Sequence, residues 1–502
     1  MHPSVSDLAA ATPAARDRYI DLLRAGSLGT VVLGHWLMAA VSVDPDGRAE
    51  IGNLLAVVPA LQPLTWLLQI MPVFFFVGGF SHALSHRSLQ RRTEPGRSVY
   101  AAFLRARLQR LLRPTMIFVA VWAAGALAVQ LLGGDGPLSD VAARLVAQPL
   151  WFIGIYLAMV AFTPPLLRLH DRYGWGAAAG LGAAAAAVDV ARFAFGVPYV
   201  EFLNFAFVWL AVHQLGFLRA DGRLAASGLR VPAALAAAGL TGAVALVAFG
   251  PYPLSMVGMP GEKVSNMAPP TLALLCHGLW LTGAVELLRA PAARLLARPR
   301  VWRGVIAANG VAMTAFLWHL TAMLGVYGAL LALGLPFPAP ATSGWWAQAP
   351  LRLAAAAGVT ALLVAAFRRF ERPAAARPDG LAYATSPSPD AAPATSPHPA
   401  PAAPASAASP RPYPAPAPTR RNAAAAPRRA AGPAAALGVT LCLFGVLGLS
   451  MVGFGGLLEG RTALLVAVHV SAPAAVVMCL AGWLLVETAG RGAGEGRRGP
   501  GH

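Results

Sequence analysis

The 502-residue sequence has few charged residues, few cysteines and a single lysine. Charged residues make up 12% of the chain, against roughly 25% in soluble domains, whereas hydrophobic residues make up 57%. This composition excludes an ordinary soluble globular domain and predicts a protein of the lipid bilayer. The three cysteines, Cys276, Cys442 and Cys479, all lie in apolar segments. We therefore expect small packing side chains and no disulfide framework.

Because Lys263 is the only lysine, the net charge of +18 comes almost entirely from arginine. Such a bias does not by itself indicate a nucleic-acid partner, and none is predicted. The positions of the arginines are more informative, because basic residues flank membrane spans on the cytoplasmic side. The N-terminal region has no short apolar stretch followed by an A-x-A cleavage site, so the first span is expected to remain as an anchor.

Apolar segments of roughly 18 to 25 residues recur along the chain, long enough to cross a bilayer core of about 30 Å. The predicted fold is all-α and polytopic, with a ten-helix transmembrane bundle followed by a C-terminal two-helix transmembrane hairpin. The predicted spans of the bundle are 19–42, 64–84, 114–133, 148–167, 176–196, 201–218, 231–250, 268–288, 305–334 and 350–367. The predicted hairpin spans are 437–458 and 462–486.

The loops between the ten spans differ strongly in charge. With the N-terminus inside, the cytoplasmic loops contain eighteen arginines, whereas the opposite loops contain three basic residues. This asymmetry predicts a multi-pass protein of the cell membrane with both termini in the cytoplasm.

The composition changes abruptly after the tenth span, where SPSPDAAPATSPHPAPAAPASAASP is too rich in proline, alanine and serine to bury a core. The predicted organisation is an N-terminal tail (1–18), a transmembrane domain (19–372), a disordered cytoplasmic linker (373–435), the hairpin (436–488) and a basic tail (489–502).

The first span, in RAGSLGTVVLGHWL, contains a histidine deep within apolar sequence. Arg24 and His35 are eleven residues apart, which on a helix is about three turns, or about 16 Å, and nearly the same azimuth. Asp21 and Arg24 are i,i+3 and could pair. One helix face could line a polar groove, in which His35 transfers protons near neutral pH. A histidine hydrogen-bonded to a neighbouring helix is the alternative.

A second cluster precedes the third span in RSVYAAFLRARLQRLLRP. Arg107 and Arg110, or Arg110 and Arg113, lie one helical turn apart, a spacing suited to phosphate oxygens. Ordinary flanking of a span by positive charge is the alternative. Together with His35, the cluster favours a phosphorylated donor inside and an acceptor beyond.

Other polar residues occur within or between spans. His82 and His86 are i,i+4, but no third ligand is apparent, so no metal site is predicted. His319 is either a second histidine of the site or the partner of an interhelical hydrogen bond. Asp189 and Arg192 are i,i+3 and could pair. The possible substrate-lining residues are His319, Glu201, Asn204 and Lys263.

Five motifs occur in an order that resembles the membrane-bound acyltransferase-3 family. They are RDRYIDLLRAGSLGTVVLGHW, MPVFFFVGGF, RARLQRLLRP, WFIGIYLAMVAFTPPLL and FLWHL, and the resemblance covers roughly residues 16–372. It implies a bundle of ten spans that takes an acyl group, often acetyl, from cytoplasmic acyl-CoA. The implied acceptors are hydroxyls of extracytoplasmic glycans, glycolipids or related molecules. Acyl-CoA is a donor substrate, and no bound cofactor is implied.

The resemblance also assigns roles to residues. In the family, the first span carries an arginine or lysine that is followed, after ten residues, by a histidine; Arg24 and His35 match this motif. The family's R-x-x-R pattern matches either Arg107 with Arg110 or Arg110 with Arg113. His35 would act as general base or as a transient acyl carrier, Arg24 and Asp21 would tune the groove, and the later arginines would hold CoA phosphates. Two alternatives stay open, a multi-span transporter and a non-catalytic scaffold.

Overall fold

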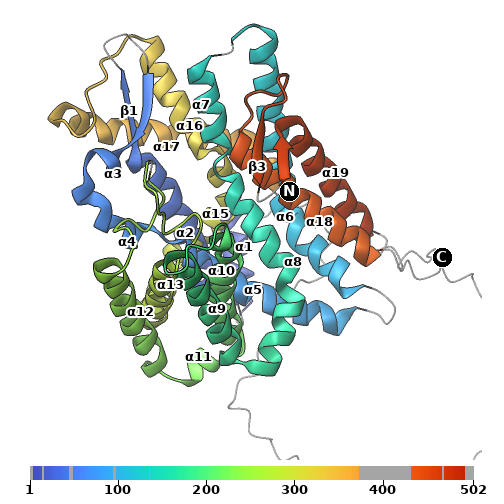
Figure 1. The fold of residues 1–502 in the computed structure, drawn as a ribbon. Coiled ribbons are helices and arrows are strands. Elements are labelled where there is room, and N and C mark those ends of the chain that lie inside the picture. Colours follow the sequence, from blue (N-terminus) through green and yellow to red (C-terminus); the bar gives the residue numbers. More distant parts are fainter. Residues whose placement is uncertain are drawn as a thin grey trace, which may run out of the picture.

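The apolar segments form long helices that pack side by side, and two short β-ribbons lie at one end of the protein (Figure 1). This computed structural model describes residues 4–13, 16–43, 49–93, 98–134, 136–259, 261–371, 431–465 and 468–491. The greater part of the predicted linker and the last residues of the predicted basic tail lie outside the described residues.

The helices and strands follow one another without a large sheet. The longer helices are α2 (Arg18–Met38), α5 (Met71–Arg92), α6 (Val99–Leu131), α7 (Pro137–Ala147), α8 (Leu150–Tyr173), α9 (Trp175–Phe193), α10 (Asn204–Ala220), α12 (Arg230–Phe249), α13 (Leu272–Leu287), α15 (Pro299–Asn309), α16 (Ala312–Ala332), α17 (Ser343–Glu371), α18 (Ala431–Val452) and α19 (Ala472–Arg491). The shorter elements are α1 (Val5–Ala10), α3 (Leu54–Val57), η1 (Pro59–Leu64), α4 (Thr65–Leu68), η2 (Val200–Leu203), α11 (Arg223–Ala226) and α14 (Arg289–Leu296). Two antiparallel ribbons are formed by β1 (Ala39–Val43) with β2 (Ala49–Asn53) and by β3 (Thr462–Leu465) with β4 (Val468–Ser471).

Ten helices of the described residues are long and apolar enough to cross a membrane, or eleven if the bent pair α13–α14 is one span. The protein is therefore a multi-pass membrane protein. The predicted count of ten plus two is not confirmed, because α2 is not among these helices. Asp21, Arg24 and His35 all lie within its 21 residues and lower its hydropathy.

The predicted span 305–334 is wrong as a single helix. The structure breaks it at Gly310 and Val311 into α15 and α16. α15 is amphipathic and begins within the arginine-rich loop, and its Trp302 and Val305 are buried against the start of α2. A helix with one apolar face lies against the bundle end instead of crossing it.

Two other boundaries differ from the prediction. The second hairpin span was expected at 462–486, but the β3–β4 ribbon comes first and α19 begins only at Ala472, with Pro473 in its first turn. The third span was expected at 114–133, but α6 begins at Val99, where the Ser98 side chain accepts a hydrogen bond from the Ala101 amide. Arg107, Arg110 and Arg113 thus lie on one continuous 33-residue helix.

The aromatic run of α5 lies in the core, and Phe75 and Phe76 are fully buried. The backbones of α5 and α10 touch at a pair of glycines. A Cβ added at Gly216 would lie 2.2 Å from the Phe76 carbonyl oxygen, and one added at Gly79 would lie 2.0 Å from the His213 carbonyl oxygen. Only glycine permits this approach, which brings polar residues of α5 and α10 into contact.

The C-terminal hairpin packs its two helices along a seam of small residues. A Cβ added at Gly445 would lie 2.6 Å from the Cys479 sulfur, and one added at Gly482 would lie 2.6 Å from the Gly438 carbonyl oxygen. Cys442 and Cys479 are buried in this seam and unbonded to other cysteines. The helices occupy residues 431–491, slightly more than the predicted hairpin 436–488, and they lie beside α6 and α8 (Figure 1).

Candidate active site

The start of α2 is held in place by a network of ion pairs. One carboxylate oxygen of Asp17 caps the helix by accepting from the amides of Tyr19 and Ile20, at 3.1 and 3.3 Å. Its other oxygen pairs with Arg219 of α10 at 2.7 Å, and Arg219 also pairs with Glu286 of α13 at 2.7 Å. The network therefore ties α2 to two other helices at this end of the bundle.

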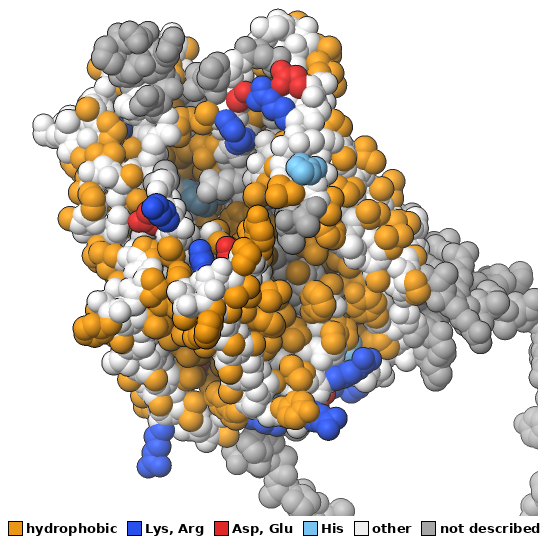
Figure 2. All heavy atoms as spheres, in the orientation of Figure 1, with side chains coloured by type: hydrophobic (Ala, Val, Ile, Leu, Met, Phe, Trp, Pro, Cys, Tyr) orange, Lys and Arg blue, Asp and Glu red, His pale blue; other side chains and the backbone are white. Residues whose placement is uncertain are grey.

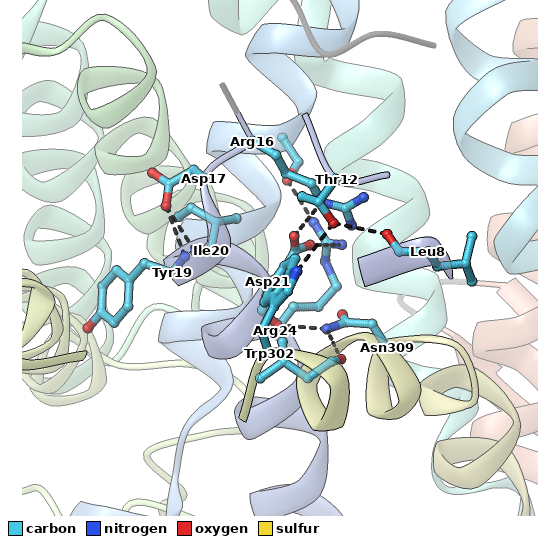
Figure 3. Close-up of polar contacts among 12 residues, drawn as sticks. Leu8, Thr12, Arg16, Asp17, Tyr19, Ile20, Asp21, Arg24, Trp302 and Asn309 are labelled. Atoms are coloured by element: carbon cyan, nitrogen blue, oxygen red, sulfur yellow. Dashed lines mark hydrogen bonds and ion pairs between the residues drawn. The ribbon is translucent and has the colours of Figure 1, made fainter. Parts of the chain in front are cut away.

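Asp21 and Arg24 form the predicted i,i+3 pair, with 3.4 Å between the guanidinium nitrogen and the carboxylate oxygen (Figure 3). The structure adds Arg16, whose Nε donates to the other oxygen of the buried Asp21 at 2.6 Å. The Asn309 amide donates to the Asp21 backbone carbonyl at 2.9 Å and ties α2 to the end of α15 (Figure 3). Two guanidinium groups thus share one carboxylate.

Arg24 and Arg107 meet at Ser81 of α5. The Arg24 guanidinium donates to the Ser81 hydroxyl at 3.1 Å, and the Arg107 guanidinium donates to the Ser81 backbone carbonyl. Arg110 is exposed on the same helix, and Arg113 is half-buried. We call Arg16, Arg24, Arg107 and Ser81 the arginine cluster, and the end of the bundle that contains it the arginine end.

His35 lies toward the other end of α2 and contacts His319 of α16. The distance between His35 Nδ1 and His319 Nε2 is 2.8 Å, and the rings stack with an angle of 13° between their planes. The Trp36 indole nitrogen donates to the His319 backbone carbonyl at 3.1 Å and joins the same two helices. The prediction that His319 makes an interhelical hydrogen bond is compatible with this contact, and its partner is the candidate catalytic histidine.

The hydrogen bonds determine which nitrogen carries each proton. His319 Nδ1 lies 2.5 Å from the Phe316 backbone carbonyl, which can only accept, so this nitrogen must be protonated. When both rings are neutral, His319 Nε2 then accepts a hydrogen bond from His35 Nδ1. The lone pair of His35 is then left on Nε2. His35 is half-buried, whereas His319 is fully buried.

The molecular surface is hollowed in the upper half of the face shown in Figure 2, and histidine and arginine side chains lie around the hollow. A small cavity between α2, α16 and α17 is lined in part by aromatic residues, among them Trp36, Tyr327 and Trp345, whereas His35 and His319 do not line it. The guanidinium of Arg352 lies over the Trp345 ring at 4.5 Å. This cavity is therefore mainly apolar and aromatic, and Arg352 is the charged residue among those that line it.

Within the part of the chain that the structure describes, no hydrogen bond joins Asn204, Glu201 or Lys263 to the histidine pair. The Asn204 amide donates to Asp189 at 2.8 Å, and Asp189 also accepts from the Tyr252 hydroxyl at 2.9 Å. Asp189 thus joins α9 to α10 and to the loop before α13, and the expected pair with Arg192 is replaced by this network. Glu201 is half-buried in η2 and Lys263 is exposed in a loop, so their proposed contact with substrate stays a prediction.

A second histidine pair lies between α5 and α10. His82 Nδ1 is 3.0 Å from His213 Nε2, and His82 Nε2 is 2.9 Å from the Tyr156 hydroxyl. The Thr163 hydroxyl is 3.5 Å from His82 Nδ1. His82 and His213 are fully buried. The sequence pattern had paired His82 with His86, one turn along the same helix, whereas its hydrogen-bonded partners come from α8 and α10.

A further polar cluster lies at the end of α8 and just after α10. His170 Nε2 lies 2.7 Å from Asp221, and Asp221 also pairs with Arg87. Burial raises the pKa of Asp221, but the hydrogen bonds from His170 and Arg87 outweigh it and lower this pKa to about 2. Arg87, His170 and Asp221 thus join the ends of α5, α8 and α10.

The sequence alone did not point to Arg16 or Ser81 as members of the arginine cluster. Arg16 lies five residues before Asp21, farther than one helical turn, and reaches it because the chain bends at the Asp17 cap. Ser81 follows Gly78 and Gly79, so the close approach of helices at the glycines was the available signal.

The protein is thus a bundle of helices suited to a membrane, with a histidine pair between α2 and α16 and an arginine cluster at one end. The family model described as an acyltransferase domain matches residues 17–368. Because the match covers more than half of the chain, the protein belongs to the acyltransferase-3 family and is a membrane acyltransferase. No curated protein and no solved structure matches the chain.

Proposed function

We propose that this protein transfers an acyl group, with acetyl as the group to test, from cytoplasmic acyl-CoA to a hydroxyl of an extracytoplasmic glycan, glycolipid or exported metabolite. The observation that carries the proposal is the state of His35, whose Nε2 holds a lone pair while its Nδ1 is bonded to His319 at 2.8 Å. A neutral imidazole with one free nitrogen is the group that general-base catalysis needs.

The proposed reaction is a direct acyl transfer with His35 as the base. His35 Nε2 removes the proton from the acceptor hydroxyl as its oxygen attacks the thioester carbonyl carbon. The bond between that carbon and the CoA sulfur breaks, and the thiolate leaves with the electron pair. The imidazolium of His35 then returns the proton to sulfur, so the products are the acyl ester and free CoA.

His319 is proposed to position His35 and to stabilise its imidazolium form. Its Nε2 accepts from His35 Nδ1, while its own Nδ1 is held by the Phe316 carbonyl at 2.5 Å. A base oriented by a third group is the arrangement known from catalytic triads. The buried contact therefore keeps the reactive Nε2 pointing away from α16.

The arginine cluster is proposed to hold the phosphates of the donor. Guanidinium groups bind phosphate through several charge-assisted hydrogen bonds. Eleven residues of helix place Arg24 about 16 Å along the axis from His35. The extended pantetheine arm of CoA suits a path between the two, with the arginine end of the bundle in the cytoplasm as the basic loops indicate.

The test uses membranes that contain the full chain, radiolabelled acetyl-CoA as donor, and mass spectrometry of envelope glycans and exported metabolites. His35→Ala should remove the labelled product while the protein still accumulates in the membrane. His469→Ala is a matched control, because His469 lies in β4, far along the chain from the family domain. Product formation by His35→Ala at the wild-type rate would disprove the proposed role. Solute flux into proteoliposomes without acyl-CoA would favour a transporter.

A further inference from the structure

The C-terminal hairpin lies outside the region matched by the family model, yet it packs closely against the acyltransferase domain. A Cβ added at Gly154 of α8 would lie 2.5 Å from a methyl carbon of Leu447 in α18. Phe454 is fully buried beside Phe118 and Trp122 of α6, with ring centroids 6.2 and 6.3 Å away. The hairpin is therefore packed as part of the bundle.

Polar contacts attach the hairpin to the family domain at the ribbon end, where the β3–β4 ribbon lies. Arg461 pairs with Asp140 of α7 at 2.5 Å. The Phe454 amide donates to the Ala143 carbonyl at 3.3 Å, and the Leu458 amide donates to the Gln130 side chain at 3.0 Å. Since Gln130 lies in the last turn of α6, the hairpin contacts the C-terminal end of this helix.

The hairpin also contacts α6 at the arginine end, through Glu487 of α19. Both carboxylate oxygens of Glu487 accept from the Gln109 amide, at 3.3 and 3.1 Å, and one lies 3.8 Å from the Arg105 guanidinium. Arg105 and Gln109 are i,i+4, so they share the α6 face toward α19. Arg107 lies about 160° away around the helix and donates to Ser81 of α5.

This segment of α6 is thus held from opposite sides. α19 holds Arg105 and Gln109, and α5 holds Arg107. We propose that the hairpin braces α6 and that Glu487 is a positioning residue, which keeps Arg107 in the arginine cluster. The bracing is inferred from the contacts of Glu487 with Arg105 and Gln109 and of Arg107 with Ser81. Its consequence for donor affinity rests on the proposed function, in which the arginine cluster binds CoA.

Charge reversal tests the brace in the full chain, reconstituted in nanodiscs. Glu487→Arg and Arg105→Glu each break the ion pair, and the double variant restores it with the net charge of the wild type. Hydrogen–deuterium exchange of residues 99–113 should be several-fold faster in both single variants and return to the wild-type rate in the double variant. Unchanged exchange in both single variants would overturn the brace. Glu459→Gln, which removes a carboxylate at the ribbon end, should leave exchange in 99–113 unchanged.

The affinity of the variants for CoA distinguishes a positioning role of Glu487 from a simple electrostatic effect of its charge. Glu487→Arg adds two positive charges near the arginine cluster, so electrostatics alone predicts tighter binding of the anionic CoA. Positioning predicts at least threefold weaker binding in this variant and recovery in the double variant. Tighter binding by Glu487→Arg would overturn the positioning role. Failure of the unaltered protein to bind CoA would instead overturn the proposed donor site, and the exchange experiment would still decide the brace.

Docking of the hairpin is tested by a protease site inserted between residues 373 and 430, with an affinity tag at the C-terminus. After cleavage in mild detergent, the tagged hairpin should retain the acyltransferase domain. Arg461→Asp should reduce retention, and Asp140→Arg combined with Arg461→Asp should restore it. Complete separation of the cleaved wild-type pieces would overturn the brace.

Discussion

The bundle contains two histidine pairs with similar nitrogen separations, 2.8 Å for His35 and His319 and 3.0 Å for His82 and His213. In the first pair a backbone carbonyl, which can only accept, fixes the proton positions. In the second pair the outer partner of His82 is the Tyr156 hydroxyl, which can donate or accept. His35 is half-buried, but both members of the second pair are fully buried. The proposed reactivity of His35 therefore rests on the partners and the exposure of its pair, because the separation of the nitrogens is similar in both pairs.

The largest expected effect comes from removing the proposed base. His35→Ala should lower the rate of acyl transfer by about 100-fold or more, because general-base catalysis typically contributes 10²–10⁴-fold. The rate is measured with radiolabelled acetyl-CoA in membranes, normalised to the amount of folded protein. A variant that keeps more than about a tenth of the wild-type rate would mean that the two histidine pairs do not differ in the proposed way.

A smaller loss is expected for the positioning histidine. His319→Ala leaves Nε2 of His35 in place but removes the acceptor of its Nδ1 proton. A hydrogen bond to a charged group contributes about 2 kcal/mol, which corresponds to about a 30-fold change in rate. The loss should appear in kcat, with the KM for acetyl-CoA within about twofold of wild type. A change confined to KM would instead place His319 in substrate binding.

The second histidine pair should affect stability and leave the chemistry intact. Tyr156→Phe leaves a buried imidazole nitrogen without its hydroxyl partner, at a cost of about 1–3 kcal/mol. We expect a lower apparent Tm in detergent, and a kcat per folded molecule within about threefold of wild type. Phe205→Leu, a change of a partly buried side chain of α10, serves as a packing control. A much larger fall in kcat for Tyr156→Phe would give the second pair a role in catalysis.

The smallest effect is expected at the contact between His170, in the last turn of α8, and Asp221, which follows α10. The pKa of Asp221 is lowered to about 2, below the value of about 3.9 for an unfolded aspartate. Its carboxylate therefore contributes to stability above about pH 4, and this contribution is lost as the pH falls from about 4 to 2. Asp221→Asn should lower the apparent Tm slightly at pH 7. The difference from wild type should shrink at acidic pH, and a constant difference would contradict the assignment.

Much of the fold followed from local patterns. The apolar segments predicted long membrane helices, and the i,i+3 spacing predicted the contact between Asp21 and Arg24. The motif order pointed to the acyltransferase-3 family, which is confirmed over residues 17–368. The break in 305–334 was missed because the apolar face of α15 continues directly into the fully apolar α16, so hydropathy alone does not separate them.

The contacts of the site could not be predicted in the same way. His35 and His319 are 284 residues apart, and Arg24 and Ser81 are 57 apart. Nothing in a helical period indicates which other helix a polar face will meet. Glu487 and Gln109 of α6 are 378 residues apart, on either side of the linker. The sequence therefore predicted the hairpin but not the surface of the bundle against which it packs.

By itself, the sequence determined that the chain enters the membrane, which family it belongs to, and that its first helix carries an arginine and a histidine on nearly one face. These properties follow from composition and from the 3.6-residue period of the helix, both of which are local. Only the tertiary structure decided that His319 binds His35, that Phe316 fixes the proton between them, and that the hairpin holds α6. Those outcomes depend on which helices become neighbours, which is set by packing across the whole bundle.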